Sequence, residues 1–204
     1  MQYKDFFKDL ITESTVVDEG PSITFIQTNL NNGIKVGFVS KGDSGDRIRA
    51  SHMRVAYKNK IHKWLVDMDN YLFEKLNFKP IPCEVVFSVI QGDDSEYGRE
   101  HAYVYRGENR IFIRSEFLSG KYSDQNVVRV LVHEWAHIWH YDNINNVDKL
   151  IEDKYEIVKL EKKKRISPYG LTNHHEFWTF LIESYDKLDT DLKQFVDYVI
   201  GEGK

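Results

Sequence analysis

The stretch that decides the fold is residues 127–141, which read VVRVLVHEWAHIWHY. Its apolar residues are so dense that they predict a helix buried on most sides. One polar stripe interrupts this apolar surface, and it consists of Arg129, His133, His137 and His140. A buried helix that still carries such a stripe should present it to a cleft.

His133 and His137 are four residues apart, so on a helix they project side by side, about 40° apart in azimuth. Two imidazoles at this spacing can bind one Zn²⁺, and Glu134 on the flanking face can reach a water on that ion. The sequence therefore predicts one zinc ion per chain. The alternative is that the histidine pair arose by chance, in which case the chain is a binding domain without metal.

A catalytic zinc site needs a third protein ligand and an open position. His140 lies one turn beyond His137 on the same helix, so we expect it to be a neighbour of the site or a surface residue. Further along the chain, His174, His175 and Glu176 follow one another. All three are possible ligands on spacing alone, and helix geometry favours Glu176.

The pattern Tyr169-Gly170-x-Thr172-Asn173-x-x-Glu176-Phe177, after the HExxH sequence, resembles the catalytic domain of anthrax lethal factor and its relatives. Those proteins are zincin peptidases of the gluzincin type. The resemblance implies a zincin-like fold, with Glu176 as the third zinc ligand and Tyr169 as a catalytic residue that helps to stabilise the tetrahedral intermediate. It is specific around these residues, looser over residues 84–185, and absent from residues 1–50.

Structural roles are the alternatives for the same residues. Asn173 and Glu176 can form a capping box at a helix start, and Tyr169 can be a packed loop residue. The chain also departs from its relatives, which often carry an acidic residue four positions after the third ligand, where this sequence has Phe180. That acidic group can orient a zinc-bound histidine. Glu183, two turns after Glu176, is the candidate to replace it.

These residues predict a zinc-dependent endopeptidase that hydrolyses a protein or peptide substrate. Zinc lowers the pKa of its bound water to about 7, Glu134 acts as general base, and the Tyr169 hydroxyl stabilises the oxyanion. Substrate is expected to pair in extended form with an edge strand, for which the hairpin at 102–114 is the candidate. The alternative is a catalytically weak or inactive zinc-binding module of zincin fold, such as a phage virion component.

Outside the motif, the sequence predicts an α+β fold with a mixed sheet. The expected helices are 3–14, 53–76, 124–141, 146–164 and 173–188, and the expected strands are 23–28, 34–40, 84–90, 102–106 and 110–114. A polar loop at 41–46 divides the chain. Residues 1–50 form an N-terminal helix and hairpin extension of unknown function, and residues 51–204 form the zincin-like metallopeptidase domain.

Composition excludes several classes of protein. The chain has 204 residues, 41% hydrophobic and 29% charged, with a net charge of −4, which suits a globular core but not a nucleic-acid surface built on net positive charge. Cys83 is the single cysteine, so an internal disulfide is excluded. No apolar run approaches the ~20 residues that span a bilayer, and residues 1–20 lack the apolar segment of a secretory signal. We therefore expect no nucleic-acid or membrane partner.

Residues 3–13 are similar to the short targeting peptides on internal proteins of T-even-type phages. Those peptides are amphipathic and end in a hydrophobic-x-Glu cleavage site, a form that Ile11-Thr12-Glu13 shares. The similarity implies a protein that is packaged in a virion and delivered to a host without a secretory signal. The alternative is an ordinary first helix in a cytoplasmic protein.

Overall fold

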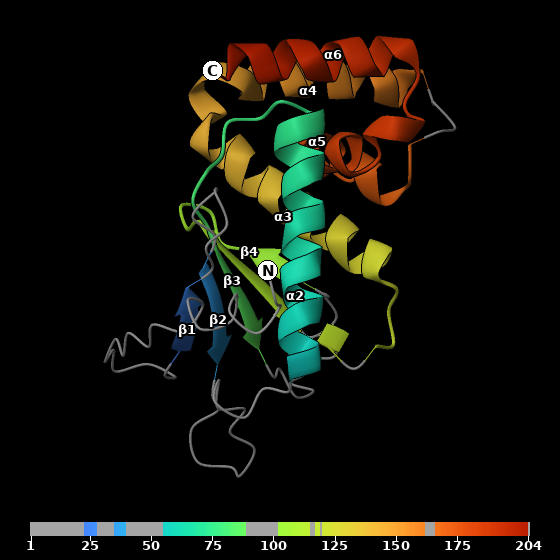
Figure 1. The fold of residues 1–204 in the computed structure, drawn as a ribbon. Coiled ribbons are helices and arrows are strands. Elements are labelled where there is room, and N and C mark those ends of the chain that lie inside the picture. Colours follow the sequence, from blue (N-terminus) through green and yellow to red (C-terminus); the bar gives the residue numbers. More distant parts are fainter. Residues whose placement is uncertain are drawn as a thin grey trace.

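The computed structural model describes residues 23–27, 35–39, 55–88, 102–114, 117–118, 120–161 and 166–203. Within these ranges the chain forms a mixed five-stranded sheet and a set of helices (Figure 1), so the predicted α+β class is confirmed. The predicted helix at 3–14, which carries the similarity to phage targeting peptides, lies outside the described residues.

The sheet has the strand order β1-β2-β3-β5-β4. Its strands are β1 (Ile23–Gln27), β2 (Lys35–Val39), β3 (Glu84–Ser88), β4 (Ala102–Val104) and β5 (Arg110–Arg114). β2, β3 and β5 run parallel, and β1 and β4 add to them in antiparallel orientation. β4 is therefore an edge strand of the described sheet, as predicted for the hairpin at 102–114.

The central strand β3 is covered on both faces. Three consecutive residues, Val85, Val86 and Phe87, are buried, which is the pattern of a strand inside a parallel sheet rather than of one with a solvated face. On the neighbouring strand β5, Ile111 and Ile113 are buried on alternate positions. Except for Val86, these side chains belong to one continuous core that also takes in the helices.

The long helices are α2 (Val55–Asp69), α3 (Asp124–Asp142), α4 (Ile144–Leu160), α5 (His174–Glu183) and α6 (Thr190–Glu202). α2 continues into the π-helical η2 (Asn70–Lys75), and two 3₁₀ turns, η4 (Tyr169–Leu171) and η5 (Tyr185–Lys187), flank α5. α6 was not among the predicted helices. Its start is capped by Asp189, whose side chain accepts a hydrogen bond from the Leu192 amide.

α3 is the central element of the fold. It contacts α2, α4 and α5 on the helical side and β4 and β5 of the sheet, while α4 and α6 lie together at the end of the molecule opposite the sheet (Figure 1). Aromatic rings hold it there: Phe78 meets both Trp135 and Trp139 at 5.1 Å between ring centroids, and Trp139 stacks on Trp178 of α5 at 5.2 Å. The polar stripe of α3 is therefore held on a rigid support.

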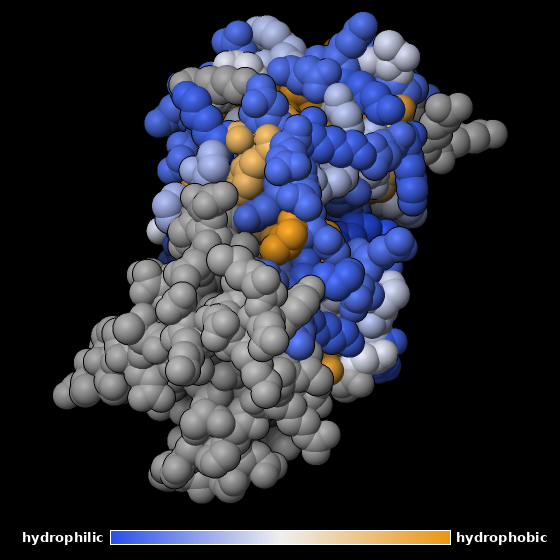
Figure 2. All heavy atoms as spheres, in the orientation of Figure 1, coloured by the Kyte–Doolittle hydropathy of each residue, from blue (hydrophilic) through white to orange (hydrophobic). Residues whose placement is uncertain are grey.

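The described part of the surface in Figure 2 is mostly hydrophilic, with hydrophobic side chains only in small groups. Among the described residues, no helix combines the length and the apolar character that crossing a membrane requires.

Candidate metal centre

The three predicted metal ligands meet at one place between α3 and α5. Nε2 of His133 lies 3.3 Å from Oε2 of Glu176, and Nε2 of His137 lies 3.5 Å from Oε1 of the same carboxylate. The two imidazole rings are 5.1 Å apart between centroids, which is the side-by-side arrangement expected of positions i and i+4. One carboxylate thus faces both histidines.

Glu176 is delivered to this place by the start of α5. The Asn173 side chain caps the helix by accepting a hydrogen bond from the Glu176 amide at 2.9 Å. The Glu176 carboxylate does not complete a capping box, because it is directed toward His133 and His137 instead. The capping role of Asn173 and the side-chain role of Glu176 therefore coexist.

Glu183 supports His133 from the other side of the ring. Its Oε2 lies 3.3 Å from Nδ1 of His133 and 3.4 Å from Nε of Arg129. A carboxylate on the second ring nitrogen fixes the tautomer and the orientation of a metal-binding histidine. Glu183 thus provides a carboxylate to His133, which the aromatic side chain of Phe180 cannot do.

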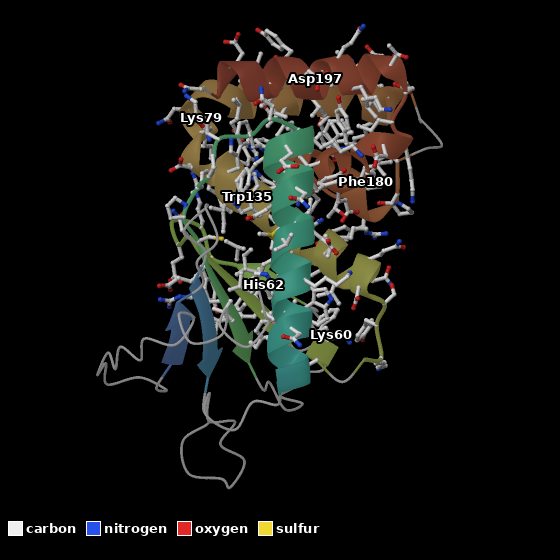
Figure 3. The ribbon with its side chains drawn as sticks, in the orientation of Figure 1. Lys60, His62, Lys79, Trp135, Phe180 and Asp197 are labelled. Carbon is white, nitrogen blue, oxygen red and sulfur yellow. The ribbon has the colours of Figure 1, made fainter. Side chains whose placement is uncertain are left out.

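Phe180, labelled in Figure 3, packs instead against Gly170, the residue after Tyr169. A Cβ added to Gly170 would lie 2.9 Å from both Cβ and Cγ of Phe180, so only glycine fits this close approach. The Tyr155 hydroxyl donates a hydrogen bond to the Leu171 carbonyl at 2.9 Å and ties η4 to α4. Phe180 therefore shapes the surroundings of Tyr169.

A cleft of about 550 Å³ opens over the three metal-ligand side chains. Its lining includes the β4 edge strand together with Tyr141, Glu134 and Tyr169. Glu134 is 7% exposed, whereas Tyr169 is 58% exposed and its ring centroid lies 5.9 Å from that of His133. Arg129, His133 and His137 of the polar stripe thus face a cleft, as predicted, whereas His140 does not line it. Both predicted catalytic residues line the cleft.

The charged groups of the site shift one another's pKa values. Burial alone lowers the pKa of His133, but the carboxylates of Glu176 and Glu183 outweigh it and raise that pKa to about 10. Burial raises the pKa of Glu176, but the neighbouring imidazoles of His133 and His137 outweigh burial and hold that pKa well below its ordinary range. Without a cation, the site therefore keeps a proton on His133 at neutral pH.

The donor set fits a zinc ion. His133, His137 and Glu176 can each place one ligand atom within 4.8 Å of the other two, and two imidazoles with one carboxylate are a usual zinc set with an open fourth position. Oε2 of Glu176 is buried and has no hydrogen-bond partner among the described residues, although Nε2 of His133 is 3.3 Å away. A buried carboxylate oxygen without a hydrogen bond is costly, and a cation between these groups would satisfy it.

No protein-family model and no curated protein sequence matches this chain. The function must therefore be inferred from the chemistry of the site.

The environment of His140 differs in part from the one predicted. It is fully buried, so it is not a surface residue. Its Nε2 lies 3.0 Å from Asp148 Oδ1, and its Nδ1 lies 3.3 Å from Nδ1 of His175. Sequence reasoning missed Asp148 altogether, because no local pattern relates a residue of α4 to a histidine of α3.

Proposed function

We propose that the chain is a zinc-dependent endopeptidase of zincin-like fold. The observation that carries this proposal is the convergence of His133, His137 and Glu176, with separations of 3.3 and 3.5 Å, in a cleft that Glu134 and Tyr169 also line. The mixed sheet, the buried helix with the histidine pair and the edge strand over the cleft are all compatible with a zincin.

His133, His137 and Glu176 are the residues that would hold the ion. When bound, Zn²⁺ supplies a Lewis acid that polarises a carbonyl and lowers the pKa of water. Glu183 keeps the Nε2 atom of His133 pointed toward Glu176 by its contact with Nδ1. Arg129 in turn contacts Glu183, so the orientation of His133 is set by a chain of charged groups.

Glu134 is the general base of the proposed reaction. It is placed on α3 next to His133, is nearly buried, and faces the cleft. From there it takes the proton of the attacking water and passes it to the leaving amine as the peptide bond breaks. The Tyr169 hydroxyl, which lines the same cleft, donates a hydrogen bond to the oxyanion that develops on the scissile carbonyl.

The proposed substrate is a peptide in extended conformation. β4 is the last strand in the sheet order, and its residues Ala102, Tyr103 and Val104 line the cleft. An extended peptide can add to such an edge through main-chain hydrogen bonds. This placement would bring its backbone past His133 and Glu134 without selecting a particular side chain.

The alternative is a non-catalytic zinc module, which was suggested because Phe180 stands where relatives often carry an acidic residue. The contact between Glu183 and His133 weakens that reason, because a carboxylate supports the histidine from another position of α5.

A library of peptides tests the proposal. We expect the zinc-loaded protein to cleave a subset of them, chelation of the metal to stop cleavage, and added Zn²⁺ to restore it. Absence of any cleavage by a folded protein that contains zinc would favour the non-catalytic module.

A further inference from the structure

A second group of metal-ligand side chains lies beside the candidate metal centre and shares no residue with it. His140, Asp148 and His175 can each place one ligand atom within 4.8 Å of the other two. They come from three different helices, α3, α4 and α5. His174 adjoins the group, with its Nε2 atom 3.0 Å from Oδ1 of Asp148.

The Asp148 carboxylate joins the group. Its Oδ1 atom lies 3.0 Å from Nε2 of His140 and 3.0 Å from Nε2 of His174. On the far side of the His140 ring, Nδ1 faces Nδ1 of His175 at 3.3 Å. Three imidazoles from two helices are therefore gathered around one carboxylate from a third helix.

His140 is the most deeply buried residue of the group. It is 0% exposed, and a histidine so buried is stable only when its polar atoms are satisfied. Its two ring nitrogens lie against Asp148 and His175, which are the other two candidate ligands. Neutral imidazole and ionised carboxylate are the forms that bind a metal.

We propose that His140, Asp148 and His175 form a second zinc site, which His174 adjoins through its contact with Asp148. Imidazole nitrogens suit zinc better than Ca²⁺ or Mg²⁺, which take oxygen ligands. The competing state is a metal-free network in which the rings hydrogen bond to Asp148 and to one another.

The second ion would position the first site. His174 and His175 form the first turn of α5 directly before Glu176, so an ion shared with His140 and Asp148 fixes that turn against α3 and α4. Glu176 is then held opposite His133 and His137. The second site stands independently of the proposed peptidase activity, because it needs neither Glu134 nor Tyr169.

Zinc counting tests the proposal. The metal-free full-length chain is loaded with Zn²⁺, excess ion is removed by gel filtration, and zinc per chain is measured by mass spectrometry. We expect two ions for the wild type, one for Asp148→Ala and for His175→Ala, and one for the double variant His133→Ala/His137→Ala. His62→Ala, on α2 (Figure 3) and outside both groups, is the matched control and should retain two.

One further measurement, together with the double variant, keeps the test decisive. Circular dichroism verifies that each variant is folded, and the double variant leaves the second group intact even if the alanine variants of Asp148 and His175 unfold. One ion in the wild type and none in the double variant, or two ions in Asp148→Ala, would overturn the second site. One ion in both the wild type and the double variant would support the second site and contradict the first. Failure of peptide cleavage would leave these counts unchanged.

Discussion

Nδ1 of His133 lies 3.3 Å from Oε2 of Glu183, seven residues after Glu176 on the same helix. The Glu176 carboxylate is on the opposite nitrogen of the same ring. One helix therefore provides both the third candidate metal ligand and the carboxylate that contacts Nδ1 of His133. The aromatic ring of Phe180 lies between them in sequence and is used for packing against Gly170.

Glu183→Gln should weaken zinc binding about 10- to 100-fold, because an amide holds the His133 ring less firmly than a carboxylate does. The affinity is measured by competition with a chromophoric chelator. Glu156→Gln on the exposed part of α4 is the matched control. Equal zinc affinities of Glu183→Gln and the wild type would show that the contact has no effect on the site.

Tyr169→Phe should lower kcat about 100-fold with little change in KM or zinc content, since the hydroxyl acts on the oxyanion rather than on substrate binding. Steady-state kinetics on a cleaved peptide, with zinc counted in parallel, provide the comparison. An unchanged kcat would assign Tyr169 a packing role only.

Gly170→Ala should destabilise the fold by about 1–3 kcal/mol, because the new Cβ would lie 2.9 Å from Phe180 and force that ring to move. Gly201→Ala is the matched control, since a Cβ there meets nothing within 4 Å and alanine is favoured over glycine in a helix. Urea denaturation measures both free energies of unfolding. A neutral Gly170→Ala substitution would contradict the close packing of Phe180 on this loop.

The metal-free protein should lose stability as the pH rises from 6.5 to about 10. Over this range folded His133 keeps a proton that the unfolded chain releases, because the raised pKa of His133 lies above its ordinary value of 6.5. Glu176 has the opposite pH dependence. It stabilises the folded state above pH 4.5, and this stabilisation is lost as the pH falls through its lowered pKa.

Urea denaturation of the metal-free chain at pH 6 and pH 9 checks this expectation. Glu176→Gln should flatten the dependence, while Glu183 and Glu134 still act on His133 and Arg129 still contacts Glu183. A wild-type protein that is more stable at pH 9 than at pH 6 would contradict the charge assignment.

Local patterns in the sequence predicted the core of the site well. The helix expected at 124–141 is α3 (Asp124–Asp142), and its histidine spacing alone places His133 next to His137. The resemblance of the short pattern around Glu176 to zincin peptidases implied that this side chain meets the two histidines, and the structure brings it there. Local sequence patterns can therefore predict those residues whose position depends mainly on their own helix.

What the sequence did not predict depends on contacts between distant elements. His140 was judged only by its place beyond His137, whereas its surroundings are set by Asp148 and His175 on two other helices. Neither contact has a signature in the residues next to it.

The central claim is tested most directly by comparing cleavage of one susceptible peptide by zinc-loaded wild type and zinc-loaded Glu134→Gln. Both proteins should contain the same amount of zinc, because Glu134 is not a ligand, and Glu156→Gln should behave as the wild type. Removal of the general base should slow cleavage by about 100-fold or more. Equal rates for Glu134→Gln and the wild type at equal zinc content would contradict the proposal that this cleft hydrolyses peptide bonds.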